Sequence, residues 1–254
     1  MTQELEVENK QGIQVITINR PQARNSLTQA VARAIAQAID ELEQRGDLRI
    51  GIITGAGGHF CAGMDLKGFL KGERPSVPGR GFGGVTEAPP KKPLIAAVEG
   101  YALAGGFELA LACDLIVASS EARFGLPEVK RGLVASAGGL LRLPERLPYH
   151  IAMEHILTGE MLTAADAHRH GLINRLVAPG QSLENAIALA QLIMKNGPLA
   201  LAASKRIVTE SADWNQDEMF AKQRMIAAPV FESQDAREGA TAFAEKRAPV
   251  WLGR

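Results

Sequence analysis

The sequence predicts an α/β protein in which a layered α/β core is followed by a module made of helices alone. Over the first part of the chain, short β-branched and aliphatic runs alternate with amphipathic helical patterns, an order typical of α/β layers. After about residue 196 only helical spacing remains. Hydrophobic residues make up 46% of the 254 residues, enough for a substantial core. We therefore expect a core over residues 1–195 and a helical module over residues 196–254.

The first elements follow one another as strand, helix and strand. Residues 13–18 are rich in β-branched side chains and precede Pro21, near which a strand must end. Residues 28–45 place apolar side chains on one helical face, and Thr28 is a suitable N-cap. Residues 49–54 then form a short buried strand that runs into a glycine-rich turn.

A second unit repeats this order after an aperiodic segment. We expect strands at residues 93–99 and 114–118, with a helix of small residues from about 106 to 112 between them. Residues 68–93 are rich in glycine and proline and lack periodicity, so we expect a mobile surface loop near the functional site. Beyond Gly197 we expect three helices, with Pro198 in the first turn of the first, over residues 199–211, 216–230 and 235–246.

Charge and composition exclude several classes of protein. The chain has 28 Lys and Arg residues against 28 Asp and Glu residues, so its formal net charge is zero, whereas nucleic-acid and membrane-surface binding normally need basic excess. Two cysteines, Cys61 and Cys113, are too few for a disulfide framework and favour a reducing compartment. The acidic N-terminus lacks the apolar core of a signal peptide, and we expect a cytoplasmic protein without a membrane span.

The common cofactor and nucleophile motifs are absent or incomplete. Residues 55–60 follow a strand, but Phe60 stands where a dinucleotide fingerprint needs its third glycine. Residues 134–138 contain Ser136 but begin with valine instead of the glycine of a nucleophile elbow. The pairs His59–Cys61 and His168–His170 have no further ligands at metal-site spacing, so no metal is expected.

Two glycine-rich segments that these motifs leave unexplained resemble the signatures of one family. They are residues 59–67, which contain Ala-Gly-Met-Asp-Leu-Lys, and residues 95–114, which contain Leu-Ala-Gly-Gly-Phe-Glu. Both are similar to segments of the crotonase, or enoyl-CoA hydratase/isomerase, superfamily. Further matches follow in order, so that the resemblance covers nearly the whole chain, at residues 19–27, 123–128, 157–174 and 196–205.

The resemblance implies a crotonase-type spiral core of ββα units with a site for an acyl-CoA thioester. Family members stabilise an enolate at the thioester carbonyl with two backbone N–H groups, which by position are those of Met64 and Gly105. Glycine at positions 105 and 106 lets a ligand approach the main chain closely, and a helix that opens there favours negative charge.

The resemblance also assigns catalytic carboxylates to Glu108 and Glu128, and hydration of an unsaturated thioester needs both an acid and a base. We expect Glu128 to deliver the proton to the α-carbon and Glu108 to hold and activate the water. From the residues alone, Glu108 also suits the first turn of a helix, and Glu128 also suits an exposed turn beside Lys130 and Arg131.

The resemblance further implies where CoA and a second subunit meet the site. No separate cofactor is needed, since CoA is part of the substrate. The family assembles as a homotrimer or a dimer of trimers, in which a neighbour's C-terminal helices complete the site. The residues implied in CoA binding are Arg24, Ala62, Asp65, Leu66 and Lys67 of the chain itself, with Phe243 and Lys246 from the neighbour.

The retained glutamates and Ser136 favour one activity among several. Isomerases of the family often carry an aspartate at or near position 136, and other branches usually change one or both glutamates. We therefore expect an enoyl-CoA hydratase that converts a trans-2-enoyl-CoA to a 3-hydroxyacyl-CoA. Carnitinyl-CoA dehydration, double-bond isomerisation and CoA binding without catalysis stay open as alternatives, whereas zero net charge opposes an RNA-binding role.

Overall fold

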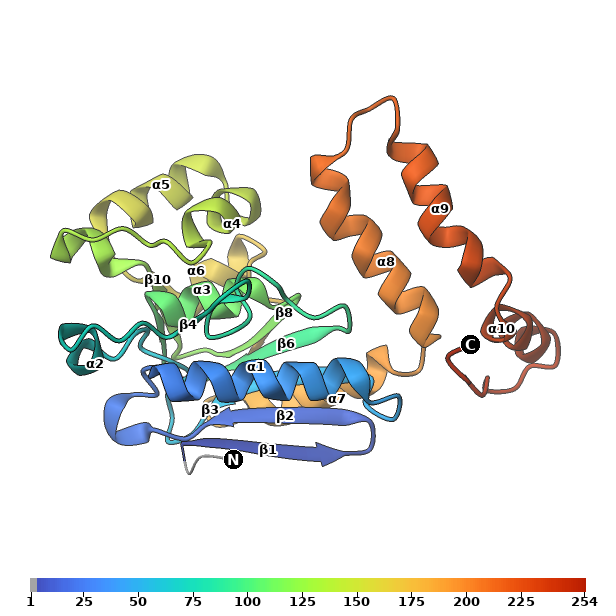
Figure 1. Cartoon of the computed structure of the whole chain (residues 1–254), viewed down its shortest axis with the longest axis horizontal. Helices are drawn as coiled ribbons and strands as arrows, with labels where there is room; N and C mark the ends of the chain where they lie inside the picture. Colours follow the sequence, from blue (N-terminus) through green and yellow to red (C-terminus); the bar gives the residue numbers. More distant parts are fainter. Residues whose placement is uncertain (1–3) are drawn as a thin grey trace.

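The computed structural model describes residues 4–254, and a six-stranded sheet forms the centre of its α/β core (Figure 1). The strand order is β1-β2-β3-β6-β8-β11, with β1 antiparallel to β2 and the remaining pairs parallel. The strands are β1 (Leu5–Lys10), β2 (Ile13–Ile18), β3 (Ile50–Gly55), β6 (Leu94–Val98), β8 (Leu115–Ser119) and β11 (Arg175–Val177).

Helices cover both faces of this sheet. Helix α1 (Gln29–Gln44) packs on one face with the larger hydrophobic cluster, and α7 (Ser182–Ile193) packs on the other with a smaller cluster. Alternate residues of one strand go to opposite clusters, as Ile52 and Ile53 of β3 do. The Thr28 hydroxyl accepts a hydrogen bond from the Val31 N–H at 3.2 Å, which confirms the predicted N-cap of α1.

Two smaller sheets lie at the edge of the core. One has the order β10-β9-β7 and consists of β10 (Leu162–Thr163), β9 (Arg123–Gly125) and β7 (Tyr101–Leu103). The other is a hairpin of β4 (Ser76–Val77) and β5 (Gly81–Phe82), inside the segment that we expected to be a loop. Short helices complete this region: η1 (Pro21–Ala23), α2 (Leu66–Leu70), η2 (Pro127–Arg131), α4 (Gly139–Arg146), α5 (Tyr149–Thr158) and α6 (Ala164–Arg169).

Helix α3 (Gly105–Ala112) lies at the centre of the molecule, and all eight of its residues are buried. It begins one residue before the position that the sequence predicted. Its small and apolar residues let it pack closely against β7 and α4. This placement puts the first turn of α3 beside the candidate site.

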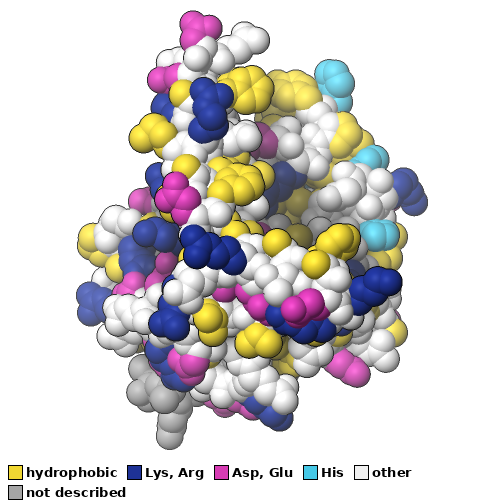
Figure 2. Space-filling view, turned by 90° about the vertical axis from the view of Figure 1, so that its right-hand side faces the viewer, with side chains coloured by type: hydrophobic (Ala, Val, Ile, Leu, Met, Phe, Trp, Pro, Cys, Tyr) yellow, Lys and Arg dark blue, Asp and Glu magenta, His cyan; other side chains and the backbone are white. Residues whose placement is uncertain are grey.

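The chain ends in helices, as the sequence predicted, and Figure 1 shows them beside the α/β core. They are α8 (Pro198–Glu210), the short η3 (Ser211–Asp213), α9 (Met219–Phe231) and α10 (Gln234–Ala244). The chain end folds back onto them, since the Leu252 N–H donates to the Asp235 carboxylate of α10 at 2.6 Å. Figure 2 shows hydrophobic side chains between charged ones on the face that carries these helices.

No single helix within residues 4–254 is both long enough and apolar enough to cross a membrane. Together, α7 and α8 with η3 meet the length and composition criteria, but they are bent by 107° at the break between them.

Candidate active site

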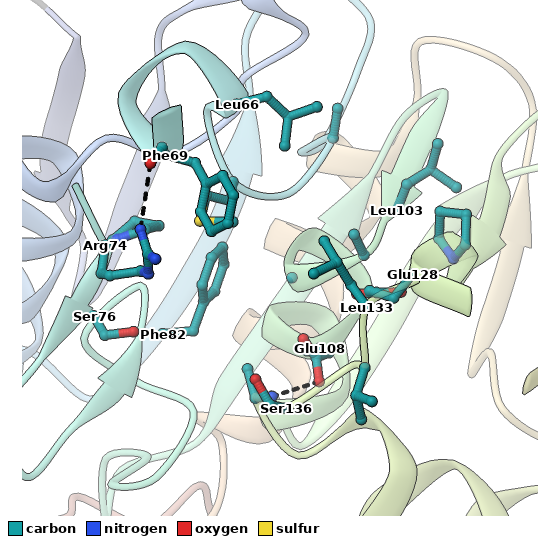
Figure 3. Close-up of a pocket in the computed structure, with 18 of the residues that line it drawn as sticks. Leu66, Phe69, Arg74, Ser76, Phe82, Leu103, Glu108, Glu128, Leu133 and Ser136 are labelled. Atoms are coloured by element: carbon teal, nitrogen blue, oxygen red, sulfur yellow. Dashed lines mark hydrogen bonds between the residues drawn. The ribbon is translucent and has the colours of Figure 1, made fainter. Parts of the chain in front are cut away.

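A cavity of about 430 Å³ opens where the N-terminus of α3 meets the loops around it (Figure 3). In the close-up, Arg74, Ser76 and Phe82 lie on one side and Leu103 and Leu133 on the other. The wall is mostly apolar, with a few polar groups, which is typical of a site for a small-molecule substrate. Its lining includes Arg24, Ala62, Met64, Leu66, Phe69, Gly105, Glu108, Glu128 and Ser136.

Two unpaired backbone donors come from two neighbouring segments of this wall. Met64 belongs to the strap formed by residues 61–65, and Gly105 is the first residue of α3. Neither N–H donates a hydrogen bond to any group within residues 4–254. Such free donors beside a cavity, one of them at a helix N-terminus, suit an oxygen that gains negative charge.

The strap packs main chain against main chain on β7 and on the start of α3. The Cys61 N–H donates to the Tyr101 carbonyl at 2.9 Å, and the Leu103 N–H donates back to the Cys61 carbonyl at 3.0 Å. Glycine is required at this contact, because a Cβ on Gly106 would lie 2.1 Å from the Cys61 carbonyl oxygen. The spacing between the two donors is therefore set by backbone contacts.

Glu108 lies in the first turn of α3 and is only 3% exposed. Its Oε1 accepts hydrogen bonds from the N–H groups of Ala137, at 2.7 Å, and Gly139, at 2.9 Å. Burial raises the pKa of Glu108, while these two backbone donors act in the opposite direction and stabilise the charged form. The carboxylate is thereby fixed in position, with one oxygen satisfied by the main chain.

Glu128 lies in η2, directly after Pro127, and its surroundings differ from those of Glu108. Its Oε2 is buried and has no hydrogen-bond partner among the described residues. Loss of solvent, together with the nearby charge of Glu108, raises the pKa of Glu128 to about 7. A carboxyl group with such a pKa can either donate or accept a proton near neutral pH.

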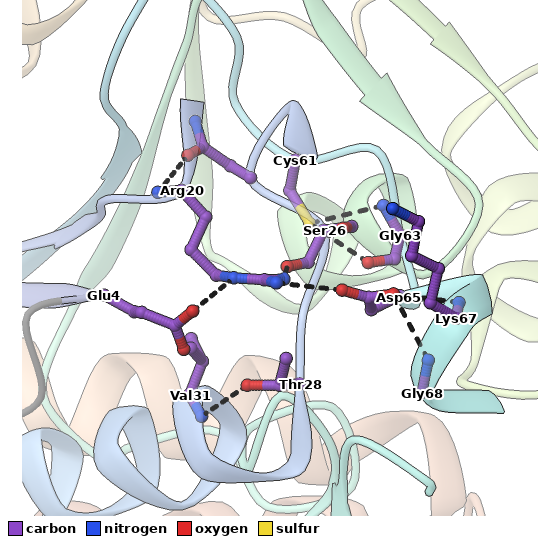
Figure 4. A network of polar contacts seen from close by, with 11 residues as sticks. Glu4, Arg20, Ser26, Thr28, Val31, Cys61, Gly63, Asp65, Lys67 and Gly68 are labelled. Carbon is purple, nitrogen blue, oxygen red and sulfur yellow. Dashed lines mark hydrogen bonds and ion pairs between the residues drawn. The ribbon is translucent and has the colours of Figure 1, made fainter. Parts of the chain in front are cut away.

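The structure brings most of the predicted site residues to one cavity. Arg24, Ala62 and Leu66 lie in its wall together with both glutamates and both backbone donors. Asp65 and Lys67 are not among the residues that line it. The Asp65 carboxylate instead accepts from the Lys67 and Gly68 N–H groups as the N-cap of α2, and it pairs with Arg20 (Figure 4).

The two residues predicted to come from a neighbouring subunit lie in the C-terminal module. Phe243 is in α10 and 87% exposed, and Lys246 follows the end of that helix. Neither lines the cavity of its own chain.

The residues of one wall of the cavity were not predicted from the sequence. Arg74, Ser76, Phe82 and Glu87 all come from the segment at residues 68–93. Its glycine and proline content predicted only a loop near the site. Individual lining residues there could not be found, because their approach to α3 depends on the β4–β5 hairpin and on its packing against α1.

Among the described residues, no group of three or more His, Cys, Asp or Glu side chains could hold a metal ion. The cavity wall combines the carboxyl groups of Glu108 and Glu128 with two backbone N–H groups that are free within the described part of the chain. Such an arrangement can add or remove a proton beside a carbonyl whose oxygen accepts both N–H groups.

This fold and site define an α/β enzyme of the crotonase type with C-terminal helices. Residues 8–254 match the model of the enoyl-CoA hydratase/isomerase family, and the chain belongs to that family. A solved enoyl-CoA hydratase from Mycobacterium tuberculosis H37Rv is 60% identical, with a TM-score of 0.97 and 99% of each chain covered. The solved enoyl-CoA hydratase EchA1 from Mycobacterium marinum is 62% identical, with the same TM-score and coverage.

Curated relatives carry two different activity names. Enoyl-CoA hydratase EchA19 of Mycobacterium tuberculosis is 42% identical over 259 residues, which cover 98% of this chain and 96% of the relative. Carnitinyl-CoA dehydratase of Salmonella typhi is 43% identical over 263 residues and is covered completely, as is this chain. The comparisons therefore establish the family and leave the choice of reaction to the site.

Proposed function

We propose that this protein is an enoyl-CoA hydratase, which adds water across the 2,3 double bond of a trans-2-enoyl-CoA to give a 3-hydroxyacyl-CoA. The observation that carries the proposal is the unequal pair Glu108 and Glu128. One carboxylate is held as an acceptor by two backbone N–H groups, and the other has a buried, unpartnered oxygen and a pKa of about 7. Two carboxyls whose pKa values are pushed apart can serve as base and acid in one reaction.

The proposed mechanism assigns one role to each group. The thioester oxygen accepts hydrogen bonds from the Met64 and Gly105 N–H groups, which stabilise the enolate as water adds to C3. Ionised Glu108 takes a proton from that water, and protonated Glu128 gives its proton to the α-carbon. One O–H bond of water and the π bond between C2 and C3 break, while a C–O bond and a C–H bond form. The two glutamates together hold one proton before and after the reaction.

We propose that CoA enters past Arg24, Ala62 and Leu66, which line the cavity. Lys67, the second residue of α2, would meet a phosphate of CoA in this proposal. Asp65 serves CoA only indirectly in this proposal, since its carboxylate is bound to Arg20 and to the N-terminus of α2.

We propose that the C-terminal module, residues 196–254, forms a homotrimer or a dimer of trimers. In that assembly Phe243 and Lys246 of one subunit would reach the CoA site of the next. The proposal is supported by the exposed apolar side chains of α8 to α10, which the core of the same chain leaves uncovered.

A second candidate is dehydration of a carnitinyl-CoA, which uses the same groups in reverse on a cationic acyl chain. The Salmonella relative with that name favours it. The cavity contains both Glu87, which would attract a quaternary ammonium group, and Arg74, which would repel it. Isomerisation is less well supported, since Ser136 lines the cavity at the position where isomerases of the family often carry an aspartate.

The test is loss of the conjugated enoyl absorbance when the protein meets trans-2-enoyl-CoAs, from four carbons to a steroid side chain, with carnitinyl-CoA assayed separately. We expect rapid loss with at least one enoyl-CoA, and a fall in rate of about 10²–10⁴-fold in Glu128→Gln and in Glu108→Gln. Glu145→Gln, which changes an exposed glutamate of α4, is the matched control and should keep full activity. A folded protein that binds CoA but consumes no enoyl-CoA would contradict the proposal.

A further inference from the structure

A network of partly buried polar contacts includes Asp65, at the end of the strap that carries the Met64 N–H (Figure 4). At its centre is Arg20, whose side chain is 11% exposed. The Arg20 guanidinium donates to the Glu4 carboxylate at 2.8 Å, to the Asp65 carboxylate at 2.9 Å and to the Ser26 carbonyl. One side chain thus joins the start of β1, the turn after η1 and the end of the strap.

Asn25 holds the same turn from the opposite side. Its side chain is fully buried, and its amide donates to the carbonyls of Ala56, at 2.8 Å, and His59, at 2.7 Å. Its Oδ1 accepts from the Arg20 N–H at 2.8 Å. Arg24 and Asn25 have φ values of 49° and 57°, which non-glycine residues rarely adopt and which persist only where surrounding contacts enforce them.

This enforced turn is hydrogen-bonded directly to the strap. The Ala62 N–H donates to the Arg24 carbonyl at 2.9 Å, and the Leu27 N–H donates to the Gly63 carbonyl at 2.7 Å. The Asp65 N–H donates to the Leu27 carbonyl at 2.9 Å, and Leu27 forms a parallel bridge with Met64. Every residue that flanks Met64 in the strap is therefore tied to the turn, and the Met64 N–H alone is left free.

We propose that Arg20 and Asp65, together with Asn25, are positioning residues that fix the Met64 N–H in line with the Gly105 N–H. The inference rests on the proposed role of these two donors. In this proposal the ion pair between Asp65 and Arg20 affects the reaction rate, and Asp65 does not contact CoA. Loss of a whole oxyanion donor costs about 10²–10³ in kcat, so a donor that is displaced but still present should cost about 10-fold.

The variant Asp65→Asn separates the ion pair with Arg20 from the capping of α2. Asparagine caps a helix as well as aspartate does, so the hydrogen bonds to Lys67 and Gly68 can persist while the ion pair with Arg20 is lost. The matched control is Asp114→Asn. Asp114 also accepts a backbone N–H, that of Leu94 at 2.7 Å, and pairs with a half-buried cation, Lys205, at 2.6 Å. Asp114 lies at the far end of α3 from the two donors, outside the strap.

The experiment measures kcat, KM and Tm of the full-length chain and its variants with the best enoyl-CoA of the panel. We expect Asp65→Asn to lower kcat about 10-fold with KM changed less than about threefold, while both variants lose a similar amount of Tm. Asp114→Asn should keep the wild-type kcat. A rise in KM with kcat unchanged would assign Asp65 to CoA binding and overturn the proposal, as would equal kcat values in the two variants.

A second readout does not depend on turnover. A dimethylaminocinnamoyl thioester of CoA absorbs at longer wavelength when its carbonyl oxygen accepts hydrogen bonds, so its spectrum on the protein reports the two donors directly. We expect a red shift with the wild type and with Asp114→Asn, and a smaller one with Asp65→Asn. Arg20→Lys, which keeps the charge but loses the fork that reaches three partners, should also reduce it.

These outcomes separate the two proposals. A red shift that Asp65→Asn reduces, in a protein that hydrates no enoyl-CoA, would support the positioning role and contradict the hydratase reaction. Hydration without any red shift in the wild type would overturn the oxyanion role of Met64 and Gly105, and the positioning role with it. A wild-type red shift retained in both Asp65→Asn and Arg20→Lys would overturn the positioning role alone.

Discussion

At the scale of single residues, two glutamates of one cavity differ because different groups face their oxygens. Glu108 is the more deeply buried of the two, yet the Ala137 and Gly139 N–H groups offset part of the rise in its pKa that burial causes. Glu128 lacks such a partner at Oε2, so desolvation and the charge of Glu108 dominate. The last proton on the pair is therefore held at Glu128 and leaves near pH 7.

The pair predicts the pH dependence of kcat/KM. The active form holds one proton on two carboxyls, so kcat/KM should fall as pH rises through about 7, where Glu128 loses that proton. It should also fall at acid pH, where Glu108 becomes protonated. Hydration releases no net proton, so both directions of the reaction must show the same profile. Rates measured from pH 5 to 9 in both directions check this, and a flat rate to pH 9 would contradict it.

The raised pKa of Glu128 also predicts how the stability of the fold depends on pH. Glu128 has a folded-state pKa of about 7 against an ordinary value of 4.5, so ionisation costs stability as pH rises between those values. Glu128→Gln removes the charge that burial penalises. Its Tm should exceed that of the wild type above pH 7, by on the order of a few degrees, and match it near pH 4. Thermal unfolding at several pH values tests this, and a Tm difference independent of pH would contradict it.

At the scale of elements, the strap and α3 touch through main-chain atoms. This contact sets the positions of the Met64 and Gly105 N–H groups. A Cβ on Gly106 would lie 2.1 Å from the Cys61 carbonyl oxygen, which cannot move without moving the strap. A Cβ on Gly105 would lie 2.4 Å from the Phe82 ring, which is a side chain and can rotate away. The two adjacent glycines therefore differ in what an added methyl group would displace.

We expect Gly106→Ala to lower kcat by about 10²–10³-fold, because it separates the Met64 and Gly105 donors. Gly105→Ala should cost less, and its effect should fall mainly on KM through the shifted Phe82. Gly46→Ala is the control, since nothing lies within 4 Å of its added Cβ. Steady-state kinetics on the three variants test the order, and equal losses at positions 105 and 106 would contradict it.

The elements that the sequence predicted are those whose pattern is local. Strand β3, helix α1 and the C-terminal helices have complete apolar runs or helical faces, and they occur within a few residues of the predicted bounds. Strand β1 was not predicted, because it lies at the edge of the sheet and most of its side chains face solvent, so its acidic residues carry no strand signal. The β4–β5 hairpin was missed because each of its strands has only two residues.

The sequence predicted the site residues that lie in the family motifs, but not the other residues that line the cavity. Glu108 and Met64 lie in the segments that resemble the family, and both line the cavity. The residues alone left Glu128 as a possible exposed turn residue beside Lys130 and Arg131, and its burial depends on the packing of η2 against α5. Arg20 lies at residues 19–27, a further match to the family that carries no catalytic group. Its role depends on contacts with residues 4 and 65, far apart in sequence.

At the scale of the whole molecule, the core and the C-terminal module differ in how they cover apolar surface. The core encloses two hydrophobic clusters, whereas α8 and α9 bury no residue completely. Met225 is 76% exposed, Phe231 80% and Phe243 87%. Burial of one large apolar side chain is worth about 1.5–3 kcal/mol, so a surface with several such residues favours association with further copies.

The oligomeric state is the last prediction. Light scattering after gel filtration should give three or six times the chain mass of 27.1 kDa. Phe231→Glu places a charge in the expected interface and should shift the mass toward one chain, whereas Leu157→Glu, at a 66% exposed position on α5 outside the module, should not. If Phe243 and Lys246 complete a neighbour's CoA site, Phe231→Glu should also raise KM while the core stays folded. A wild-type protein that elutes as a single chain and hydrates enoyl-CoA at full rate would show that the site is complete within one subunit.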